Sequence, residues 1–249
     1  MIEIKNLTVG YGERAVLQKT SATFEKGMLT SVIGTNGCGK STLLKTLTGI
    51  LPFSEGEILL GGVDIRKAKR IDIAKRVSYL AQGKGTPDMT VFQMVLHGRF
   101  PHLGYPRRYT CRDREIAYYA MQRVGISDLA DKPMSTLSGG MRQNAYIAMA
   151  LAQDTDYILL DEPTTYLDIA HRLELMRILR ELTDDGKGVV AVMHDLPLAF
   201  SFSDKITLIN NRTVIAEDEP RNLAGQSVIE DVFGIKIKVN EENEYSYQY

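Results

Sequence analysis

The chain has 249 residues and a formal net charge of −1, so its overall charge does not predict binding to nucleic acid or to an acidic membrane surface. Two cysteines, Cys38 and Cys111, cannot build the disulfide framework of a small secreted domain, which favours a reducing compartment. The longest apolar run, residues 145–152, is too short to span a membrane, and the alternating start Ile2-Glu3-Ile4-Lys5 is unlike a signal peptide. We therefore expect a soluble chain that acts at a membrane only through a partner.

Short alternating segments dominate the first part of the chain. Residues 2–9 alternate as an edge strand would, and residues 16–24 are predicted to form a second strand after a glycine turn. Residues 57–60 and 63–65 are further short strands separated by Gly61-Gly62. We expect these strands to form an antiparallel layer beside the main core. Residues 77–80 are predicted to form another strand, which ends just before Gln82.

A phosphate-binding motif follows the buried strand predicted at residues 29–33. Residues 34–41 fit the P-loop pattern G-x-x-x-x-G-K-[ST], and residues 40–47 have helical spacing that ends at Gly49. Glycines let backbone N–H groups surround phosphate oxygens, and a helix N-terminus adds partial positive charge. Lys40 would bridge the β- and γ-phosphates, and Ser41 would hold Mg²⁺. The predicted nucleotide contacts are Gly34, Thr35, Asn36, Gly37, Cys38, Gly39, Lys40, Ser41 and Thr42.

Cys38 lies beside Lys40 at the start of the predicted helix. Positive charge and a helix N-terminus both lower the pKa of a thiol. We therefore expect a reactive thiol whose alkylation abolishes activity. The alternative is that Cys38 is a spacer whose side chain points away from the ligand.

Helices and loops replace strands from residue 83 onward. Helices are predicted at residues 91–96, 113–124 and 140–153, whereas the Gly- and Pro-rich stretch 98–106 is predicted to be irregular. We interpret residues 83–154 as a helical lobe inserted into an α/β core.

Alternation of strands and helices then resumes. Strands are predicted at 157–160, 189–193 and 205–209, and helices at 169–182 and 196–200, which implies a parallel sheet covered on both faces. In the first helix Ile169, Leu173, Met176 and Leu179 fall on one face, which we expect to be buried. Residues 1–239 are interpreted as one domain, and the polar tail 240–249 is expected to fray. The predicted fold is α/β: a P-loop NTPase core with a mostly parallel sheet, an N-terminal antiparallel layer and the inserted helical lobe.

Two carboxylates follow the apolar strand Tyr157-Ile158-Leu159-Leu160. The carboxyl edge of a parallel sheet is where α/β proteins bind ligands. In a P-loop ATPase, Asp161 would hold Mg²⁺ through water, and Glu162 would orient or deprotonate the attacking water.

A second candidate anion site lies at Leu137-Ser138-Gly139-Gly140, where Ser138 is a good cap for the helix that follows. One nucleotide already bound by residues 34–41 does not require it. The segment resembles the signature motif of ABC (ATP-binding cassette) ATPases, in which the signature of one subunit closes on the ATP of the other. The resemblance implies that Ser138, Gly139 and Gly140 contact the ATP of a partner subunit.

Four more residues match that family in order. Gln82 is similar to the Q-loop glutamine that reaches Mg²⁺ and water, and Asp168 to the D-loop residue that crosses the dimer interface. His194 resembles the switch histidine that contacts the γ-phosphate, and Tyr11 the aromatic residue that stacks on adenine. The catalytic residues implied are Glu162, His194, Gln82 and Lys40, and the metal ligands implied are Ser41, Gln82 and Asp161.

The resemblance extends over residues 2–239 and reaches a subfamily. Gly98-Arg99-Phe100-Pro101, Leu129-Ala130-Asp131 and residues 164–171 look like the ATPases of bacterial importers for iron–siderophore complexes, haem and cobalamin. The alternative is a non-transport ABC ATPase of DNA repair, chromosome maintenance or translation. Those types usually carry long coiled coils or two cassettes, and neither is evident here. A small-molecule kinase lacks the signature motif.

The importer reading implies several partners. The chain would use ATP and Mg²⁺ and form a homodimer, or pair with a second ATPase subunit, on the cytoplasmic face of the cell membrane. An integral permease would dock on residues 83–109, with Val91, Met94 and Val95 as the floor of a groove and Arg99, Arg107 and Arg108 pairing with acidic groups. An extracytoplasmic binding protein would take part indirectly, and no nucleic acid would be bound.

Overall fold

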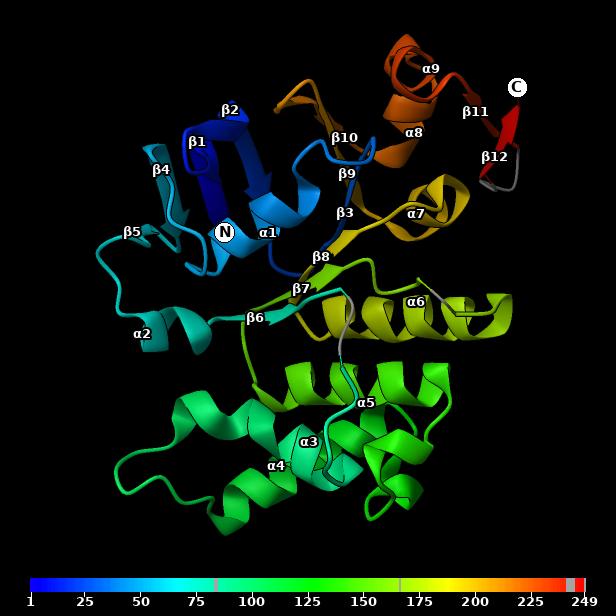
Figure 1. Cartoon of the computed structure of the whole chain (residues 1–249). Helices are drawn as coiled ribbons and strands as arrows, with labels where there is room; N and C mark the ends of the chain where they lie inside the picture. Colours follow the sequence, from blue (N-terminus) through cyan, green and yellow to red (C-terminus); the bar gives the residue numbers. More distant parts are fainter. Residues whose placement is uncertain (83–84, 166, 241–244, 249) are drawn as a thin grey trace.

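A computed structural model describes residues 1–82, 85–165, 167–240 and 245–248. Residues 83–84 of the predicted docking segment, Tyr166 of the subfamily motif and part of the predicted tail lie outside these ranges. The described chain contains two main sheets with helices between and below them (Figure 1).

A six-stranded sheet with the order β10-β9-β3-β8-β7-β6 forms the centre of the chain. Its strands are β3 (Leu29–Gly34), β6 (Val77–Leu80), β7 (Tyr157–Asp161), β8 (Gly188–Val192), β9 (Lys205–Asn210) and β10 (Thr213–Asp218). All neighbouring pairs are parallel except β9 and β10. β3, β7 and β8 are buried at every residue, as expected of strands covered on both faces. The predicted mostly parallel sheet is confirmed, whereas the antiparallel β10 was not predicted.

The predicted antiparallel layer is also confirmed. It comprises β1 (Ile2–Tyr11), β2 (Arg14–Phe24), β4 (Glu55–Leu60) and β5 (Val63–Asp64), in the order β2-β1-β4-β5. The prediction that residues 2–9 form an edge strand is wrong, because β1 pairs with β2 on one side and β4 on the other.

Helix α1 (Lys40–Leu47) packs between the two sheets (Figure 1). Its Leu43 and Leu44 share one buried cluster with Phe24 of the antiparallel layer and with Leu159 of the central sheet. The short helix α2 (Arg70–Ala74) precedes β6. The P-loop helix is therefore held by apolar contacts from both layers.

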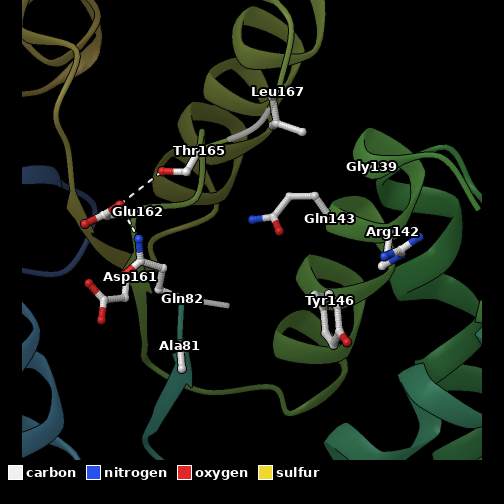
Figure 2. A pocket seen from close by; sticks show the side chains of 10 residues that line it. All are labelled: Ala81, Gln82, Gly139, Arg142, Gln143, Tyr146, Asp161, Glu162, Thr165 and Leu167. Carbon is white, nitrogen blue, oxygen red and sulfur yellow. Dashed lines mark hydrogen bonds between the residues drawn. The ribbon is translucent and has the colours of Figure 1, made fainter. Parts of the chain in front are cut away.

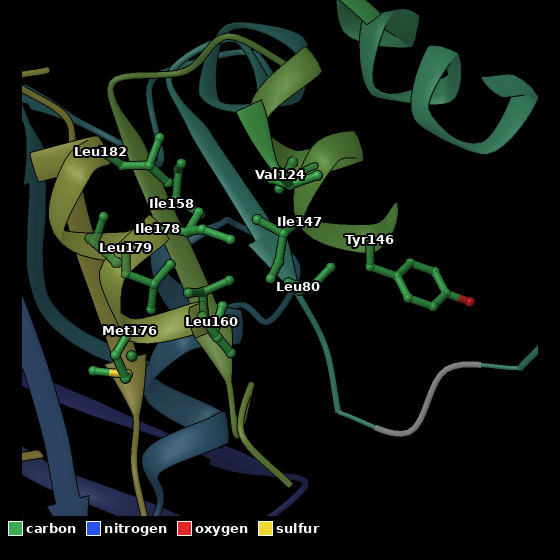
Figure 3. Packing of buried hydrophobic residues seen from close by; sticks show 14 of the residues in the cluster. Leu80, Val124, Tyr146, Ile147, Ile158, Leu160, Met176, Ile178, Leu179 and Leu182 are labelled. Atoms are coloured by element: carbon green, nitrogen blue, oxygen red, sulfur yellow. The ribbon is translucent and has the colours of Figure 1, made fainter. Parts of the chain in front are cut away.

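The other face of the central sheet is covered by α5 (Gly139–Ala152) and α6 (Ile169–Asp184). Figure 3 shows Ile147 of α5 and Leu179 of α6 converging on β7. The predicted buried face of α6 is half wrong. Met176 and Leu179 are buried, but Ile169 is 75% and Leu173 38% exposed. The buried residues of α6 begin at Leu175, because its first turn lies outside the apolar cluster.

The interval between β6 and β7 contains only helices and loops among its described residues, and it forms the lobe at the bottom of Figure 1. Besides α5, the helices are α3 (Val91–Leu96), η1 (His97–His102), α4 (Cys111–Arg123), η2 (Ser127–Leu129) and η3 (Met134–Thr136). Capping boxes at Thr90 and Thr110 begin α3 and α4. The expectation of an irregular stretch at 98–106 is wrong for η1. Gly98 allows this turn to sit on α5, since a Cβ there would lie 2.1 Å from the Met149 carbonyl oxygen.

A buried ion pair joins η1 to α4. Arg99 and Asp113 are 6% and 7% exposed, with Nε and Oδ1 3.1 Å apart, and Arg99 also donates to the Ala152 carbonyl at 2.8 Å. Burial raises the pKa of Asp113, but hydrogen bonds from Thr110 and then Arg99 outweigh it and hold the pKa below its usual value. The expectation that Arg99 pairs with a partner protein is therefore wrong, because its own chain already neutralises it.

The expected groove floor is also corrected. Val91 and Val95 are fully buried in the hydrophobic core, where they pack within the chain and face no partner. Met94 is partly buried against the same core. The three residues follow helical spacing, but the rest of the lobe covers the face they share.

The C-terminal part packs beside β9 and β10. It comprises α7 (Leu196–Phe202), α8 (Pro220–Ala224), α9 (Ser227–Phe233), β11 (Lys236–Val239) and β12 (Tyr245–Gln248). β12 pairs antiparallel with β11, and the rings of Tyr245 and Phe200 lie 5.5 Å apart. The expectation of a frayed tail is wrong for residues 245–248, because an aromatic contact and strand pairing hold them.

The Arg99–Asp113 pair yields a stability prediction. Replacing Arg99 by Met removes the cation and leaves an ionised, buried Asp113, which should cost about 3 kcal/mol of unfolding free energy. We expect a lower urea midpoint, followed by circular dichroism at pH 7, where the carboxyl is charged. The exposed Arg108→Met is the matched control and should unfold like the parent. Equal midpoints for the two variants would contradict the proposed importance of the pair.

Candidate functional site

Four parallel strands bring the predicted catalytic residues to one edge of the sheet. The P-loop follows β3, Gln82 follows β6, Glu162 follows β7 and His194 follows β8. Because these strands are parallel, their carboxyl ends lie at the same edge, where α/β sheets bind ligands.

The P-loop is shaped by close approaches that only glycine permits. Gly39 has φ of +113°, and a Cβ there would lie 2.7 Å from Leu17 Cδ2. Gly34 runs so close to β9 that a Cβ would lie 2.2 Å from the Ile209 carbonyl oxygen. α1 begins immediately after this turn, so its first N–H groups have no partner within the helix and are available to an anion.

Lys40 is buried at the base of this loop. Its Nζ donates to the carbonyl oxygens of Gly34 and Thr35, both at 2.9 Å. An ammonium group has one further N–H to offer a phosphate oxygen. The loop carbonyls therefore fix the cation where the phosphates of a nucleotide would lie.

Asp161 connects the P-loop helix to the central sheet. Its Oδ1 accepts from Ser41 Oγ at 2.8 Å, and its Oδ2 accepts from the Tyr79 hydroxyl at 3.0 Å. Burial, and then the charge of Asp161, raise the pKa of Tyr79, so this phenol stays protonated and donates. A hydroxyl and a carboxylate are oxygen ligands of the kind that Mg²⁺ prefers, so Ser41 and Asp161 fit that ion.

The described part of the protein offers few further ligands for a metal ion beside Ser41 and Asp161. Among the described residues no group of three His, Cys, Asp or Glu side chains could hold a metal. Phosphate oxygens and water would therefore complete the coordination. The amide nitrogen of Gln82 donates to Glu162, which leaves only the amide oxygen of Gln82 as a ligand atom.

The Glu162 carboxylate is fixed by three side chains from three parts of the chain. Its Oε2 accepts from Gln82 Nε2 at 2.6 Å and from Thr165 Oγ1 at 3.1 Å (Figure 2). Its Oε1 lies 2.6 Å from His194 Nε2. Glu162 itself has φ of +53°, a left-handed conformation that is unusual for this residue. A carboxylate oriented in this way can position a water molecule and accept its proton.

Sequence reasoning missed Tyr79 and Thr165. Tyr79 pairs with Leu159 across the β6–β7 ladder, and Asp161 lies two residues further along β7 on the same face. Strand periodicity could have found Tyr79 once the strand neighbours were known. Thr165 carries no such signal in the sequence.

Cys38 contradicts the expectation of a reactive thiol. Its side chain is 8% exposed and belongs to the apolar cluster around α1. Burial raises the pKa of the thiol by more than the nearby Lys40 lowers it. Its side chain faces the protein interior, which matches the spacer alternative.

Tyr11 ends β1 and is 52% exposed. It lines a cavity of about 330 Å³ together with Val16, Gly37 and Arg212. Its ring therefore lies beside the P-loop, where an aromatic ring can stack on a nucleotide base.

The predicted signature residues lie across a second cavity from the Glu162 carboxylate. Ser138 caps α5 by accepting from the Met141 N–H at 3.3 Å. Gly139 and three side chains of α5 form one wall of a cavity of about 240 Å³, and Gln82 and Glu162 form the other (Figure 2). Asp168 caps α6 beside this helix.

Comparison with known proteins places this arrangement in a family. Residues 17–165, more than half of the chain, match the profile of the ABC transporter family. The chain belongs to this family. The petrobactin import ATP-binding protein FpuD of Bacillus anthracis is 39% identical over 96% of the chain and 88% of that protein. The ferric enterobactin transport ATP-binding protein FepC of Escherichia coli is 39% identical over 94% of the chain and 88% of that protein.

A solved ABC structure agrees with the whole fold. A structure described as the inward-facing conformation of a metal-chelate type ABC transporter has a TM-score of 0.85 and 27% identity, covering 100% of this chain and 97% of that one. ABC ATPases hydrolyse ATP, so this chain is an ATPase. No helix in the described ranges is both long and apolar enough to cross a membrane.

The burial of Cys38 yields a labelling prediction. In the folded protein at pH 8, iodoacetamide should modify the exposed Cys111 well before Cys38, because the Cys38 thiol is shielded and its pKa is raised. Peptide mass spectrometry over a time course would measure both rates. Labelling in urea, where both thiols are accessible, is the control. Equal rates in the native protein would contradict the assignment.

Proposed function

We propose that this chain is the ATP-hydrolysing subunit of a bacterial importer for iron–siderophore complexes. The observation that carries the proposal is the Glu162 carboxylate, held by Gln82, Thr165 and His194 at the same sheet edge as the P-loop. The siderophore class is supported by relatives whose names specify petrobactin and enterobactin import. Nothing in the described lobe favours a non-transport ABC ATPase, since its longest helix is α5.

The reaction is hydrolysis of ATP to ADP and phosphate. The loop amides and Lys40 would bind the phosphates, and Ser41 and Asp161 would hold Mg²⁺, which neutralises charge on the transferred group. Glu162 would orient the attacking water and take its proton. Gln82 and His194 would hold the Glu162 carboxylate in position next to the γ-phosphate. Tyr11 would stack on adenine.

The active unit would be a dimer, either of this chain or of this chain with a second ATPase subunit. Ser138 and Gly139 are exposed at the start of α5, where a helix N-terminus offers donors to an anion. Met141 in the same turn is 44% exposed, and the apolar side chains Ile169 and Leu173 in the first part of α6 are exposed as well. If a second chain covered these side chains, four residues of this chain would contact the ATP bound to that partner: Ser138, Gly139, Gly140 and Asp168.

The permease would dock on the exposed part of residues 83–109. Tyr105 is fully exposed and Phe100 44% exposed, and the Arg107 guanidinium lies 4.5 Å above the Phe100 ring. This surface replaces Val91, Val95 and Arg99, which are buried. Arg107 and Arg108 would pair with acidic groups of the permease. The chain would thus lie on the cytoplasmic face of the cell membrane, with an extracytoplasmic binding protein supplying the ligand and no nucleic acid involved.

The composite site is tested by Glu162→Gln. Without the base, phosphate release should fall by about 100-fold or more, while the binding contacts remain. ATP should then convert the monomer to a dimer, measured by size-exclusion chromatography with light scattering. The double variant Lys40→Ala/Glu162→Gln is the control and should stay monomeric, because it loses a phosphate contact. A Glu162→Gln protein that is monomeric at saturating ATP would contradict the dimer.

The docking surface is tested by Tyr105→Asp combined with Arg107→Glu. The isolated variant should keep its basal ATPase rate, because neither residue touches the ATP site. Co-expressed with its permease, the variant should fail to co-purify and should not support uptake of a labelled ferric siderophore. Lys238→Glu, an exposed charge reversal on β11, is the control and should assemble normally. Normal assembly and uptake by the double variant would rule out this surface.

A further inference from the structure

The N-termini of α5 and α6 touch at a point that none of the roles above uses. A Cβ on Gly140 would lie 2.5 Å from His171 Cδ2 and 2.9 Å from His171 Nε2. The His171 ring therefore rests directly on the backbone of the signature segment. Glycine is needed at this position because of close approach, since any side chain would overlap the ring.

Asp168 fixes the His171 ring from the other side. Its Oδ1 accepts from the His171 backbone N–H at 2.9 Å, which caps α6. The His171 Nδ1 lies 2.9 Å from both oxygens of the same carboxylate. A carboxylate only accepts, so Nδ1 carries the proton and donates. The ring thus has one rotamer and one tautomer imposed on it by the residue that precedes α6.

A second contact holds the same turn. Arg172 Nε donates to the Leu167 carbonyl at 2.8 Å, and its guanidinium lies 3.5 Å from Asp195, which caps α7 next to the switch histidine. The turn before α6 is therefore anchored to the strand-end site through Arg172 and to the signature through His171. A plain helix cap would require neither contact.

We propose that His171 is a positioning residue that aligns Asp168 with Ser138–Gly140 where both face the partner subunit. This inference rests on the composite ATP site proposed above and adds the residue that aligns its two trans components. His171 acts through Gly140 and Asp168, so it should control closure of the dimer and leave ATP binding to the monomer unchanged.

A double-mutant cycle in the Glu162→Gln background tests the contact. His171→Ala should weaken ATP-driven dimerisation by about tenfold, or about 1.4 kcal/mol. Gly140→Ala should weaken it at least as much, because its methyl group displaces the ring. The double variant should be no worse than His171→Ala alone, since removing the ring makes room for the methyl group. Dimerisation is measured by analytical ultracentrifugation over an ATP titration.

Controls separate alignment from folding and from failure of the dimer itself. In the His171 variants, binding of a fluorescent ATP analogue to monomers and the thermal midpoint should match the parent. Arg177→Ala, an exposed change further along α6, should dimerise normally. His171→Asn can still donate to Asp168 but lacks the ring, so it should behave like His171→Ala.

Several results would overturn the role of His171. Additive losses in the cycle, parental dimerisation by His171→Ala, or full recovery in His171→Asn would each remove the ring contact from the mechanism. If the Glu162→Gln parent itself stays monomeric while binding ATP, the proposal of an ATP site shared by two chains is wrong. The proposed role of His171 is then wrong as well. A dimerising parent with unaffected His171 variants would refute the inference alone.

Discussion

The parallel alignment of β3, β6, β7 and β8 is the constraint on which the ATPase site depends. Residues far apart in sequence meet only because these strands end at the same edge. The negative charges of Asp161 and Glu162 then determine which side chains lie around them. Asp161 is buried and needs donors, which Ser41 and Tyr79 supply, and Glu162 receives the Gln82 amide. Each carboxylate is thus oriented by side chains of its own chain.

Helix α5 links this edge to the helical lobe. The Tyr146 hydroxyl donates to the Gly85 carbonyl at 2.5 Å, and Arg142 donates to Thr86 at 3.0 Å. Gly85 lies close in the sequence to Gln82, whose amide donates to the Glu162 carboxylate. On the function proposed above, these contacts from α5 beside Gln82 support a coupling between ATP and the lobe that carries the exposed Tyr105 surface.

Local patterns predicted most of the fold and the centre of the site. The P-loop glycines, the apolar strand before Asp161 and the capping Ser138 each carry their structural reason within a few residues. Predictions failed where packing between distant segments decides. From the sequence, Arg99 was expected to be a surface charge. In the structure it is buried, because Asp113 and the Ala152 carbonyl satisfy its guanidinium within the chain. Cys38 reads as an activated thiol, but the apolar cluster around α1 raises its pKa. Ile169 reads as core because helical periodicity cannot say how far the sheet extends.

The first turn of α6 exposes apolar side chains to solvent. Ile169 and Leu173 are exposed to water, so they contribute little of the hydrophobic free energy that burial on a helix face normally provides. Met141 beside the signature is exposed as well. The same region holds two helix N-termini, with Asp168 and Ser138 as caps. Exposed apolar side chains beside two helix N-termini suit the partner interface proposed above. The His171 ring on Gly140 links these two helix starts directly, which supports the alignment of Asp168 with the signature segment proposed above.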